Sequence, residues 1–262
     1  MDLGLKGKRA LVLGAGGGLG QAVALSLAAE GAVVVAAGRT LDKVQQTVEQ
    51  IKSAGGTAHA MTWDVRELDR LSALHDQAVQ LAGGHIQILF NNGGGPAPSP
   101  VQAQPLSVWQ EQVNNLILPV IALTDAVLPA MKQHGWGRIL TNASSGVVVP
   151  IPNLAMSNTL RGALVGWNKT LANEVAASGV TANMVLPGRV ATDRTRFIDQ
   201  NKATKEGVGV EEIERRSMAS IPVGRYGKPQ EYGDVVAFLA SERASYVTGS
   251  MVRIDGGAIL SV

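Results

Sequence analysis

The sequence predicts an α/β fold, a doubly wound parallel sheet with helices on both faces. Short apolar segments alternate with longer amphipathic ones along the 262 residues. The composition agrees, because 45% of the residues are hydrophobic and only 17% are charged, as expected when strands are covered on both faces. Since the alternation continues to near the end of the chain, we expect a single domain over residues 1–262.

Seven short apolar segments are predicted to be strands. Residues 9–13 and 33–37 are apolar runs that are followed by glycine, which is typical of buried strands. Residues 58–63 and 86–90 follow as the third and fourth strands, each before a polar turn. The later strands are expected at 138–141, 182–186 and 250–254.

Between these strands the chain has helical patterns, predicted at residues 21–30, 42–53, 68–82, 109–132, 156–177 and 231–240. In the fifth of them the apolar residues fall at spacings of four, three, four and four, which places them on one helical face: Leu160, Leu164, Trp167, Leu171 and Val175. Residues 193–225 interrupt the alternation, being long, polar and mixed in charge. Their position at the carboxyl edge of the sheet favours a substrate lid over a disordered connection.

Composition excludes several function classes. The chain has no cysteine, so disulfides, thiolate metal sites and Cys nucleophiles are absent. Its four histidines, His59, His75, His85 and His134, lie far apart without ligand spacing, so we expect surface or loop positions and no metal site.

Charge and hydropathy give no sign of a nucleic-acid or membrane partner. The net charge is only +2, and no basic block interleaves with aromatic residues, although the pI is near 9.0. The first residues lack the charged and apolar regions of a signal peptide. No uninterrupted apolar stretch reaches the roughly 18 residues of a membrane span. We therefore expect a cytoplasmic protein that binds neither nucleic acid nor membrane.

The glycine-rich segment 14–20 carries the first functional signal. It follows the first predicted strand and opens the first helix. Glycines at such a turn let the backbone approach a pyrophosphate, and the helix N-terminus supplies free N–H groups. A turn without ligand is the alternative, but the strand–glycine–helix context near the amino end favours a dinucleotide.

The spacing of Gly14, Gly18 and Gly20 resembles that of the short-chain dehydrogenase/reductase family, which has a Rossmann fold. Asp64, after the third strand, is similar to the adenine-contacting acid of that family. The family's Asn-Asn-Ala-Gly turn has its counterpart at residues 91–94, with Gly93 in place of Ala, and its C-terminal Asp-Gly-Gly at residues 255–257. The resemblance therefore extends along nearly the whole chain.

The segment that lies beside the nicotinamide in this family resembles Pro187-Gly188 with Thr192. Together with Arg39, these motifs define the expected cofactor contacts: Gly14, Gly18, Leu19, Gly20, Arg39, Asp64, Val65, Asn91, Gly93, Arg161, Pro187, Gly188, Val190 and Thr192.

The end of the second strand indicates which cofactor is preferred. An acid at this place would bind the ribose 2′-hydroxyl and reject a 2′-phosphate, but the chain has Gly38 followed by Arg39. A guanidinium can pair bidentately with a phosphate, which favours NADP(H) over NAD(H). The alternative is a solvated arginine. Members of the family that prefer NADP often carry a basic residue inside the glycine loop, where this chain has Gly16 and Gly17.

The residues that carry proton transfer in the family are replaced here. Without gaps between 137 and 188, the catalytic Ser of the family falls on Ser144, its Tyr on Ser157 and its Lys on Arg161. The helix Asn of the family falls on Leu116. Asn114 and Asn115 are adjacent but point in other helical directions.

These replacements change the available chemistry. A phenol beside an ammonium group is a usable acid, whereas a serine hydroxyl is much weaker and arginine stays protonated. Ser157 and Arg161 share one helical face, so Ser157 and Ser144 could hydrogen-bond a carbonyl oxygen while Arg161 stabilises negative charge. A bound water could relay the proton. The alternative for both residues is ordinary helix polarity with a structural ion pair.

The leading hypothesis is thus an NADP(H)-dependent oxidoreductase that acts on a carbonyl or alcohol through a non-standard proton relay. A dinucleotide-binding pseudoenzyme or regulatory subunit is the second hypothesis, and a lyase or isomerase the third. Arg161, Arg189 and Arg194 could favour an anionic substrate, or could be three unrelated exposed arginines. The resemblance also implies a homotetramer, assembled through the two long helices and the C-terminal strand.

Overall fold

The computed structural model describes residues 1–261 and contains a seven-stranded parallel sheet in the order β3-β2-β1-β4-β5-β6-β7. The strands are β1 (Arg9–Leu13), β2 (Val33–Gly38), β3 (Thr57–Thr62), β4 (Ile88–Asn91), β5 (Gly137–Asn142), β6 (Val180–Pro187) and β7 (Met251–Ile254). The strand order reverses between β1 and β4, which is where doubly wound sheets bind ligands at the carboxyl ends of the strands. The predicted fold class is confirmed.

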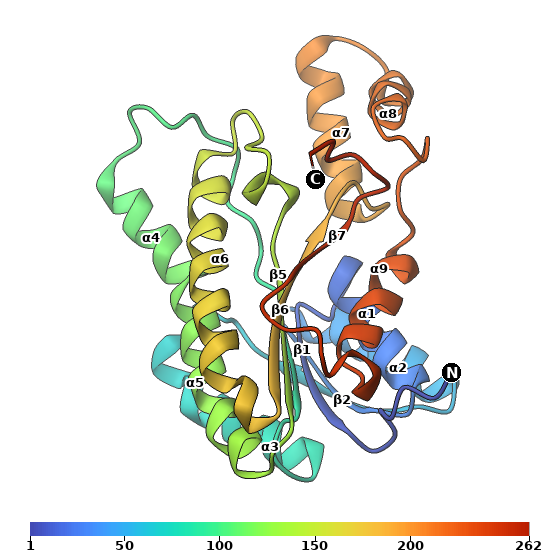
Figure 1. Cartoon of the computed structure of the whole chain (residues 1–262). Coiled ribbons are helices and arrows are strands. Elements are labelled where there is room, and N and C mark those ends of the chain that lie inside the picture. The colour runs from blue at the N-terminus through green and yellow to red at the C-terminus, as the bar shows by residue number, and fades with distance from the viewer. Residues whose placement is uncertain (262) are drawn as a thin grey trace.

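Helices cover both faces of the sheet (Figure 1). One face carries α1 (Gly18–Ala29), α2 (Leu41–Ser53) and α9 (Pro229–Leu239). The other carries α3 (Leu71–Ala82), α5 (Leu118–Gln133) and α6 (Ala155–Val175), with α4 (Leu106–Leu116) beside α6. Single turns of 3₁₀ helix lie at η1 (Leu68–Arg70), η2 (Ser145–Val147), η3 (Ala176–Ser178) and η4 (Glu242–Ala244).

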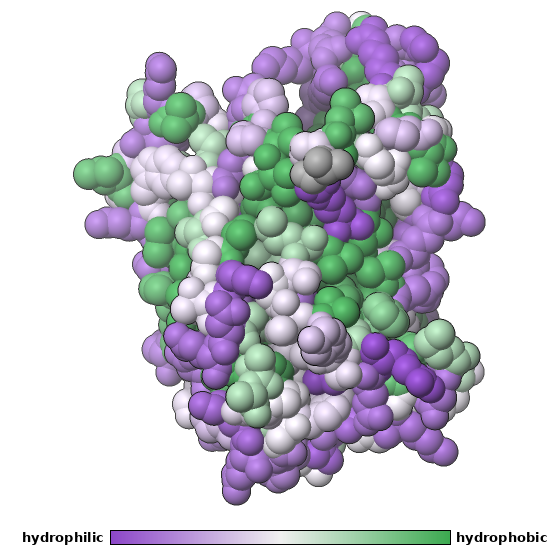
Figure 2. All heavy atoms as spheres, viewed as in Figure 1, coloured by the Kyte–Doolittle hydropathy of each residue, from purple (hydrophilic) through white to green (hydrophobic). Residues whose placement is uncertain are grey.

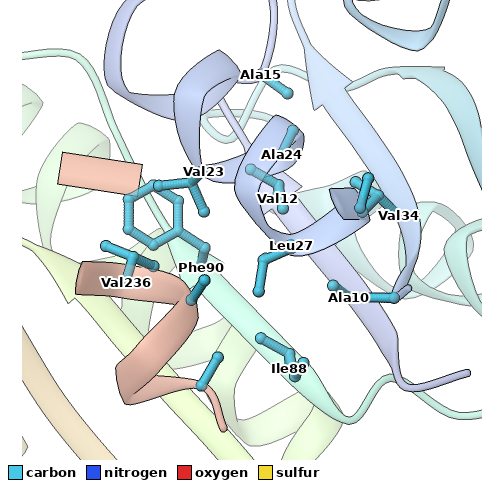
Figure 3. Packing of buried hydrophobic residues seen from close by; sticks show 14 of the residues in the cluster. Ala10, Val12, Ala15, Val23, Ala24, Leu27, Val34, Ile88, Phe90 and Val236 are labelled. Atoms are coloured by element: carbon cyan, nitrogen blue, oxygen red, sulfur yellow. The ribbon is translucent and has the colours of Figure 1, made fainter. Parts of the chain in front are cut away.

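The core on the α1 face shows why the strands are continuous apolar runs. Figure 3 shows Val23 and Leu27 of α1 packed over the strands, with Val236 of α9 beside Phe90 of β4. Alternate β1 residues belong to the two cores, so Val12 packs on the α1 side while its neighbours pack on the other. Because both faces of the sheet are covered, β1 is apolar from Ala10 to Leu13 and does not alternate between apolar and polar residues.

The long helix predicted at residues 109–132 is instead two helices, α4 and α5. The break lies at Ile117, which ends α4 and precedes α5 although its φ of −98° and ψ of −59° stay in the right-handed helical region. Pro119 causes it, because proline has no N–H and its ring clashes with the carbonyl four residues earlier. Taken together, Leu106–Gln133 is apolar and long enough to cross a membrane by composition and length. Core helices pass the same test, and Leu123 and Val127 are buried against the sheet.

The segment 193–225 is helical, which its polar composition did not indicate. It contains α7 (Asp193–Glu206) and α8 (Val210–Ala219), which project beyond the carboxyl edge of the sheet (Figure 1). Thr192 caps α7, its hydroxyl accepting from Thr195 N, and Gly207 ends it with a φ of 68°. We call α7 and α8 the lid helices, after the substrate lid that the sequence led us to expect in this segment. Their outer surface is mainly polar (Figure 2).

Two histidines that were expected at surface or loop positions, and that lie in loops, meet at the amino edge of the sheet. The rings of His85 and His134 stack with their centroids 4.0 Å apart. Arg9 donates from Nε to the His85 carbonyl at 2.8 Å, and the Nε2 atom of His85 is buried without a hydrogen-bond partner. No group of three or more metal-ligating side chains occurs within residues 1–261.

Candidate cofactor and active site

The glycine turn after β1 forms an open cradle. Gly17 precedes α1, makes no side-chain cap, and has no atom within 4 Å of the place where a Cβ would lie. No side chain obstructs the start of α1 at Gly17, and the first N–H groups of a helix have no partner within it, with the favourable end of the helix dipole behind them. A Cβ on Gly20 would lie 2.2 Å from the Gly14 carbonyl oxygen, so only glycine permits this tight turn. These residues fit a pyrophosphate.

The segment after β6 closes the cradle from the opposite side. The Gly188 N–H donates to the Ile254 carbonyl at 2.9 Å, and a Cβ on Gly188 would collide with the Asp255 backbone at 2.6 Å. Four residues later, the Thr192 methyl lies 3.6 Å from the Cβ position of Gly18. Thr192 thus comes to the glycine loop, and Pro187, Gly188 and the buried Val190 precede it on the same segment. Leu19 of the loop packs onto the core.

Two basic residues lie at the end of β2. Arg39 is exposed there, and the Lys43 Cβ of α2 lies 3.1 Å from the Cβ position of Gly16. Lys43 therefore comes close to the glycine loop at a place where the loop itself has no side chain. Sequence reasoning missed it, because the spacing along α2 does not reveal which helix residue turns toward the loop. No acid follows β2.

Asp64, expected at the adenine, is paired instead with Arg66. The Arg66 guanidinium donates to both Asp64 oxygens, at 2.9 Å from Nε to Oδ1 and 2.5 Å from Nη2 to Oδ2. This bonding to Arg66, with a smaller effect of Arg39, lowers the pKa of Asp64. An adenine contact would have to share the carboxylate with Arg66. The neighbouring Val65 is half-buried.

The turn after β4 points its two asparagines in opposite directions. Asn91 is 1% exposed and donates from Nδ2 to Thr124 Oγ1 at 3.3 Å, so its side chain faces α5 and not the cradle. Asn92 donates to the Leu13 carbonyl at 3.2 Å, at the base of the glycine loop. Only the backbone of Asn91 is left for the cofactor contact that the resemblance implied. Gly93 follows at the rim.

Ser157 and Arg161 occupy one buried face of α6, with exposures of 8% and 7%. The Ser157 hydroxyl makes no hydrogen bond to residues 1–261 and is not sealed from solvent. Ser144 caps η2, its hydroxyl accepting from Gly146 N at 3.1 Å. Asn158 donates to the Ile151 carbonyl at 2.9 Å and so ties the loop after Ser144 to α6.

Arg161 is a buried cation with only backbone partners. Its Nη1 donates to the Asn142 carbonyl at 2.9 Å and its Nη2 to the Gly93 carbonyl at 3.4 Å. Within residues 1–261 no carboxylate lies within 4.0 Å of it, which argues against the structural ion pair. Burial lowers the pKa of Arg161, because the charged form loses water. A bound group with negative charge or oxygen acceptors would compensate this cation.

The place of the expected helix Asn is apolar. Leu116 is 5% exposed, packs with Met156 and Leu160, and has its Cδ2 atom 4.0 Å from the Cβ position of Gly93. Asn115 turns away, with its Nδ2 3.5 Å from Glu111 Oε1, and Asn114 is exposed. Neither amide therefore replaces the missing one.

The other two arginines proposed for an anionic substrate do not join Arg161. Arg189 donates from Nη1 to Asp199 Oδ1 at 2.5 Å, so its charge is already compensated. Arg194 is exposed on α7. Of the three, only Arg161 lies buried at the carboxyl ends of the strands.

Three comparisons place these features among known proteins. Residues 14–258 match the family model described as enoyl-(acyl carrier protein) reductase. The chain is 33% identical to the 3-oxoacyl-(acyl-carrier-protein) reductase FabG of Aquifex aeolicus, over 98% of this chain and 99% of that one. It superposes on L-sorbose reductase from Gluconobacter frateurii, complexed with NADPH and L-sorbose, with a TM-score of 0.93, 28% identity and full coverage of both chains. A 7α-hydroxysteroid dehydrogenase complexed with NADH gives a TM-score of 0.88 and 29% identity, with coverage of 99% and 97%.

Proposed function

Because this chain belongs to the short-chain dehydrogenase/reductase family, we propose that it is an oxidoreductase that transfers a hydride between NADP(H) and a carbonyl or alcohol substrate. The observation that carries this proposal is the open glycine cradle, with Gly17 unobstructed and the Thr192 methyl 3.6 Å from the Cβ position of Gly18. When bound, the nicotinamide supplies or accepts the hydride. The chain itself must orient the substrate oxygen and handle its proton.

Preference for NADP(H) rests on charge at the end of β2. Arg39 directly follows β2 and Lys43 lies close to the glycine loop, and the strand end itself has no acid to bind a 2′-hydroxyl and repel a 2′-phosphate. The relatives support the use of either nicotinamide cofactor, since L-sorbose reductase is complexed with NADPH and the 7α-hydroxysteroid dehydrogenase with NADH. The basic residues Arg39 and Lys43 of this chain favour NADPH.

The proton relay that we propose uses hydroxyls and a guanidinium. Ser144 and Ser157 supply hydrogen bonds to the substrate oxygen, and Arg161 stabilises negative charge on it. Arg161 suits this role because it is 7% exposed and has no carboxylate partner within residues 1–261. Since neither serine is a strong acid, a water molecule in contact with them passes the proton to or from solvent.

Substrates that carry an anionic group fit this site. Arg161 has a buried guanidinium that bonds only to backbone carbonyls. A cation in such a place favours a nearby negative charge on the substrate. Because Arg189 is paired with Asp199, it does not add to this attraction. The proposed substrate class is therefore a small carbonyl or alcohol compound, with an anionic form preferred.

Turnover of NADPH with a panel of ketones, and of NADP with the matching alcohols, tests the function. We expect absorbance of the reduced cofactor to change with at least one pair of substrates, and anionic members to be turned over faster than their neutral analogues. Turnover of a compound without change in NADPH absorbance would point to lyase or isomerase chemistry instead.

A dinucleotide-binding pseudoenzyme or regulatory subunit is the second candidate. The observation that favours it is the apolar environment of Leu116, Met156 and Leu160 where a polar relay residue was expected. This candidate predicts tight NADPH binding without hydride exchange on any panel compound. A single compound that oxidises NADPH in an Arg161-dependent reaction excludes it.

In either case we propose a cytoplasmic homotetramer, which light scattering can test.

A further inference from the structure

A chain of side-chain hydrogen bonds crosses the carboxyl ends of three adjacent strands. Asn92, after β4, donates from Nδ2 to the carbonyl of Leu13 in β1 at 3.2 Å. Asn142, at the end of β5, donates from Nδ2 to Asn92 Oδ1 at 2.8 Å. The hydroxyl of Tyr232 in α9 donates to Asn142 Oδ1 at 2.9 Å. The chain begins at the residue directly before the glycine loop.

Elementary chemistry determines the direction of every bond in this chain. The Leu13 carbonyl can only accept, so Asn92 turns its NH₂ group to Leu13 and its oxygen to Asn142. Asn142 then gives its own NH₂ group to Asn92, which leaves its oxygen facing Tyr232. Tyr232 is fully buried, and burial raises the pKa of its phenol, so the group remains a neutral donor.

Asn142 connects this chain to Arg161. The Asn142 carbonyl accepts from Arg161 Nη1 at 2.9 Å, and the other acceptor of the guanidinium, the Gly93 carbonyl, directly follows Asn92. Both acceptors of Arg161 therefore belong to backbone segments that the Asn142–Asn92 bond joins. Arg161 comes from α6 on one face of the sheet, whereas Tyr232 comes from α9 on the other (Figure 1).

We propose that Tyr232 and Asn142 are positioning residues that set the place of the Arg161 guanidinium at the cofactor site. Packing alone does not require them, since Tyr232 lies in an apolar core with Phe90 and Val236, where an apolar side chain would avoid burying polar atoms. Each donor and acceptor that forms the chain has its partner, as expected of a buried polar network that specifies one arrangement. The effect on NADPH rests on the proposed function, but the positioning itself does not.

Tyr232→Phe tests the positioning without any cofactor. It keeps the ring, whose centroid lies 6.4 Å from that of Phe90, and leaves the Asn142 oxygen without a donor. The matched control is Val236→Ala, which removes packing from the same helix and leaves the chain of hydrogen bonds intact. In the full-length apoprotein, we expect Tyr232→Phe to speed hydrogen exchange at residues 91–95 and 138–144, and Val236→Ala to speed it mainly within α9. The same pattern in both variants would overturn the proposal.

A double-mutant cycle with NADPH as the probe gives the second readout. We expect Tyr232→Phe to weaken NADPH binding about 3- to 10-fold, within the coupling range of neighbours in one network. In an Arg161→Ala background it should have no further effect, because its target is gone. An equal loss in both backgrounds would contradict positioning. If the unaltered protein does not bind NADPH, the proposed cofactor function fails, while the exchange experiment still decides the positioning.

A third variant covers the case in which Tyr232→Phe folds poorly. Tyr232→Phe combined with Asn142→Leu replaces both partners of their bond by apolar groups and so removes the unsatisfied Asn142 oxygen. Because it also leaves Asn92 Oδ1, at a half-buried residue, without its donor, it should restore only part of the lost thermal stability. NADPH affinity should stay reduced, because the link to Asn92 is still missing. Recovery of NADPH affinity together with stability would mean that the two residues act only on folding.

Discussion

Arg189 and Asp199 form an ion pair that joins the end of β6 to α7, with Arg189 Nη1 2.5 Å from Asp199 Oδ1. Asp199 is fully buried and also accepts from the Tyr226 hydroxyl at 2.8 Å. The pair therefore connects the segment beside the glycine loop with one of the lid helices. A buried carboxylate of this kind depends on its partners to compensate its charge.

Arg189→Leu should destabilise the protein and loosen α7. The substitution leaves the buried Asp199 carboxylate without its cationic partner. We therefore expect the free energy of unfolding to fall by about 3 kcal/mol, which is at the low end for a broken buried pair because Arg189 is partly exposed. Chemical denaturation measures the loss, and limited proteolysis within 193–225 reports lid opening. Arg196→Leu removes an exposed i,i+3 pair with Asp193 on the same helix and should have no resolvable effect. Equal effects of the two substitutions would show that the burial of Asp199 is unimportant.

Arg39→Ala should reduce the preference for NADPH over NADH. If its guanidinium pairs with the 2′-phosphate, NADPH binding weakens about 10-fold or more, while NADH binding is unchanged. Fluorescence titration with both cofactors measures the two dissociation constants. Lys43→Ala should give a smaller loss of the same kind, because an ammonium makes no bidentate contact. Arg70→Ala, whose partner is Glu67, serves as control and should alter neither affinity. Equal binding of NADPH and NADH by the unaltered protein would refute the preference.

Ser157→Ala should lower kcat on a substrate found in the panel without weakening NADPH binding. Removing a hydrogen-bond donor to a developing oxyanion costs about 100-fold in rate, and a positioned proton-transfer group costs about as much. Steady-state kinetics together with a cofactor titration separates the two effects. Ser145→Ala, one residue beyond Ser144, is the matched control. A relay through Ser157 is wrong if both variants turn over substrate as fast as the unaltered protein.

The fold was predictable because its signals are local. Uninterrupted apolar runs such as 33–37 can be accommodated only where both faces are covered, and the glycine spacing after β1 identifies the cradle. The predicted helix boundaries differ from the observed ones where a single residue interrupts a helix, as Pro119 does between α4 and α5. The helices within 193–225 were not predicted, because helical structure in α7, whose residues are mostly polar, depends on a cap at Thr192 rather than on an apolar face.

The interior of the site was not predictable, since its contacts join distant residues. Asn142 and Tyr232 are 90 positions apart, and neither belongs to a sequence motif. Arg189 looked like an exposed arginine, because its partner Asp199 lies in a segment without a predicted fold. The one signal in the sequence for this chain of hydrogen bonds was a polar residue at the end of an apolar strand, Asn142 at the end of β5.

Acid should destabilise the protein through His85 before its carboxylates titrate. Burial, with smaller effects of His134 and Arg9, lowers the pKa of His85 below the ordinary value for histidine, so the folded state binds a proton less readily than the unfolded state. The neutral form is favoured on folding, and stability is therefore lost as the pH falls below about 6.5. Denaturant midpoints between pH 8 and 5 should fall, and His85→Gln should flatten the curve. His59→Gln, on β3, is the control, and an unchanged slope in His85→Gln would assign the loss to other groups.

Met251→Asp should break the proposed homotetramer. Met251 lies on β7, the edge strand, and is 44% exposed. The C-terminal part of the chain also exposes the apolar side chains of Phe238, Tyr246 and Leu260. Figure 2 shows apolar surface on this side of the molecule. An exposed edge strand with apolar side chains favours association, and a carboxylate placed in such an interface would be buried without a partner. Light scattering after size exclusion should give a smaller assembly than the unaltered protein. Leu41→Asp, at a site 40% exposed in α2 and away from β7, should leave the mass unchanged. A monomeric unaltered protein would end the tetramer proposal, and an unchanged mass for Met251→Asp would exclude β7 from the interface.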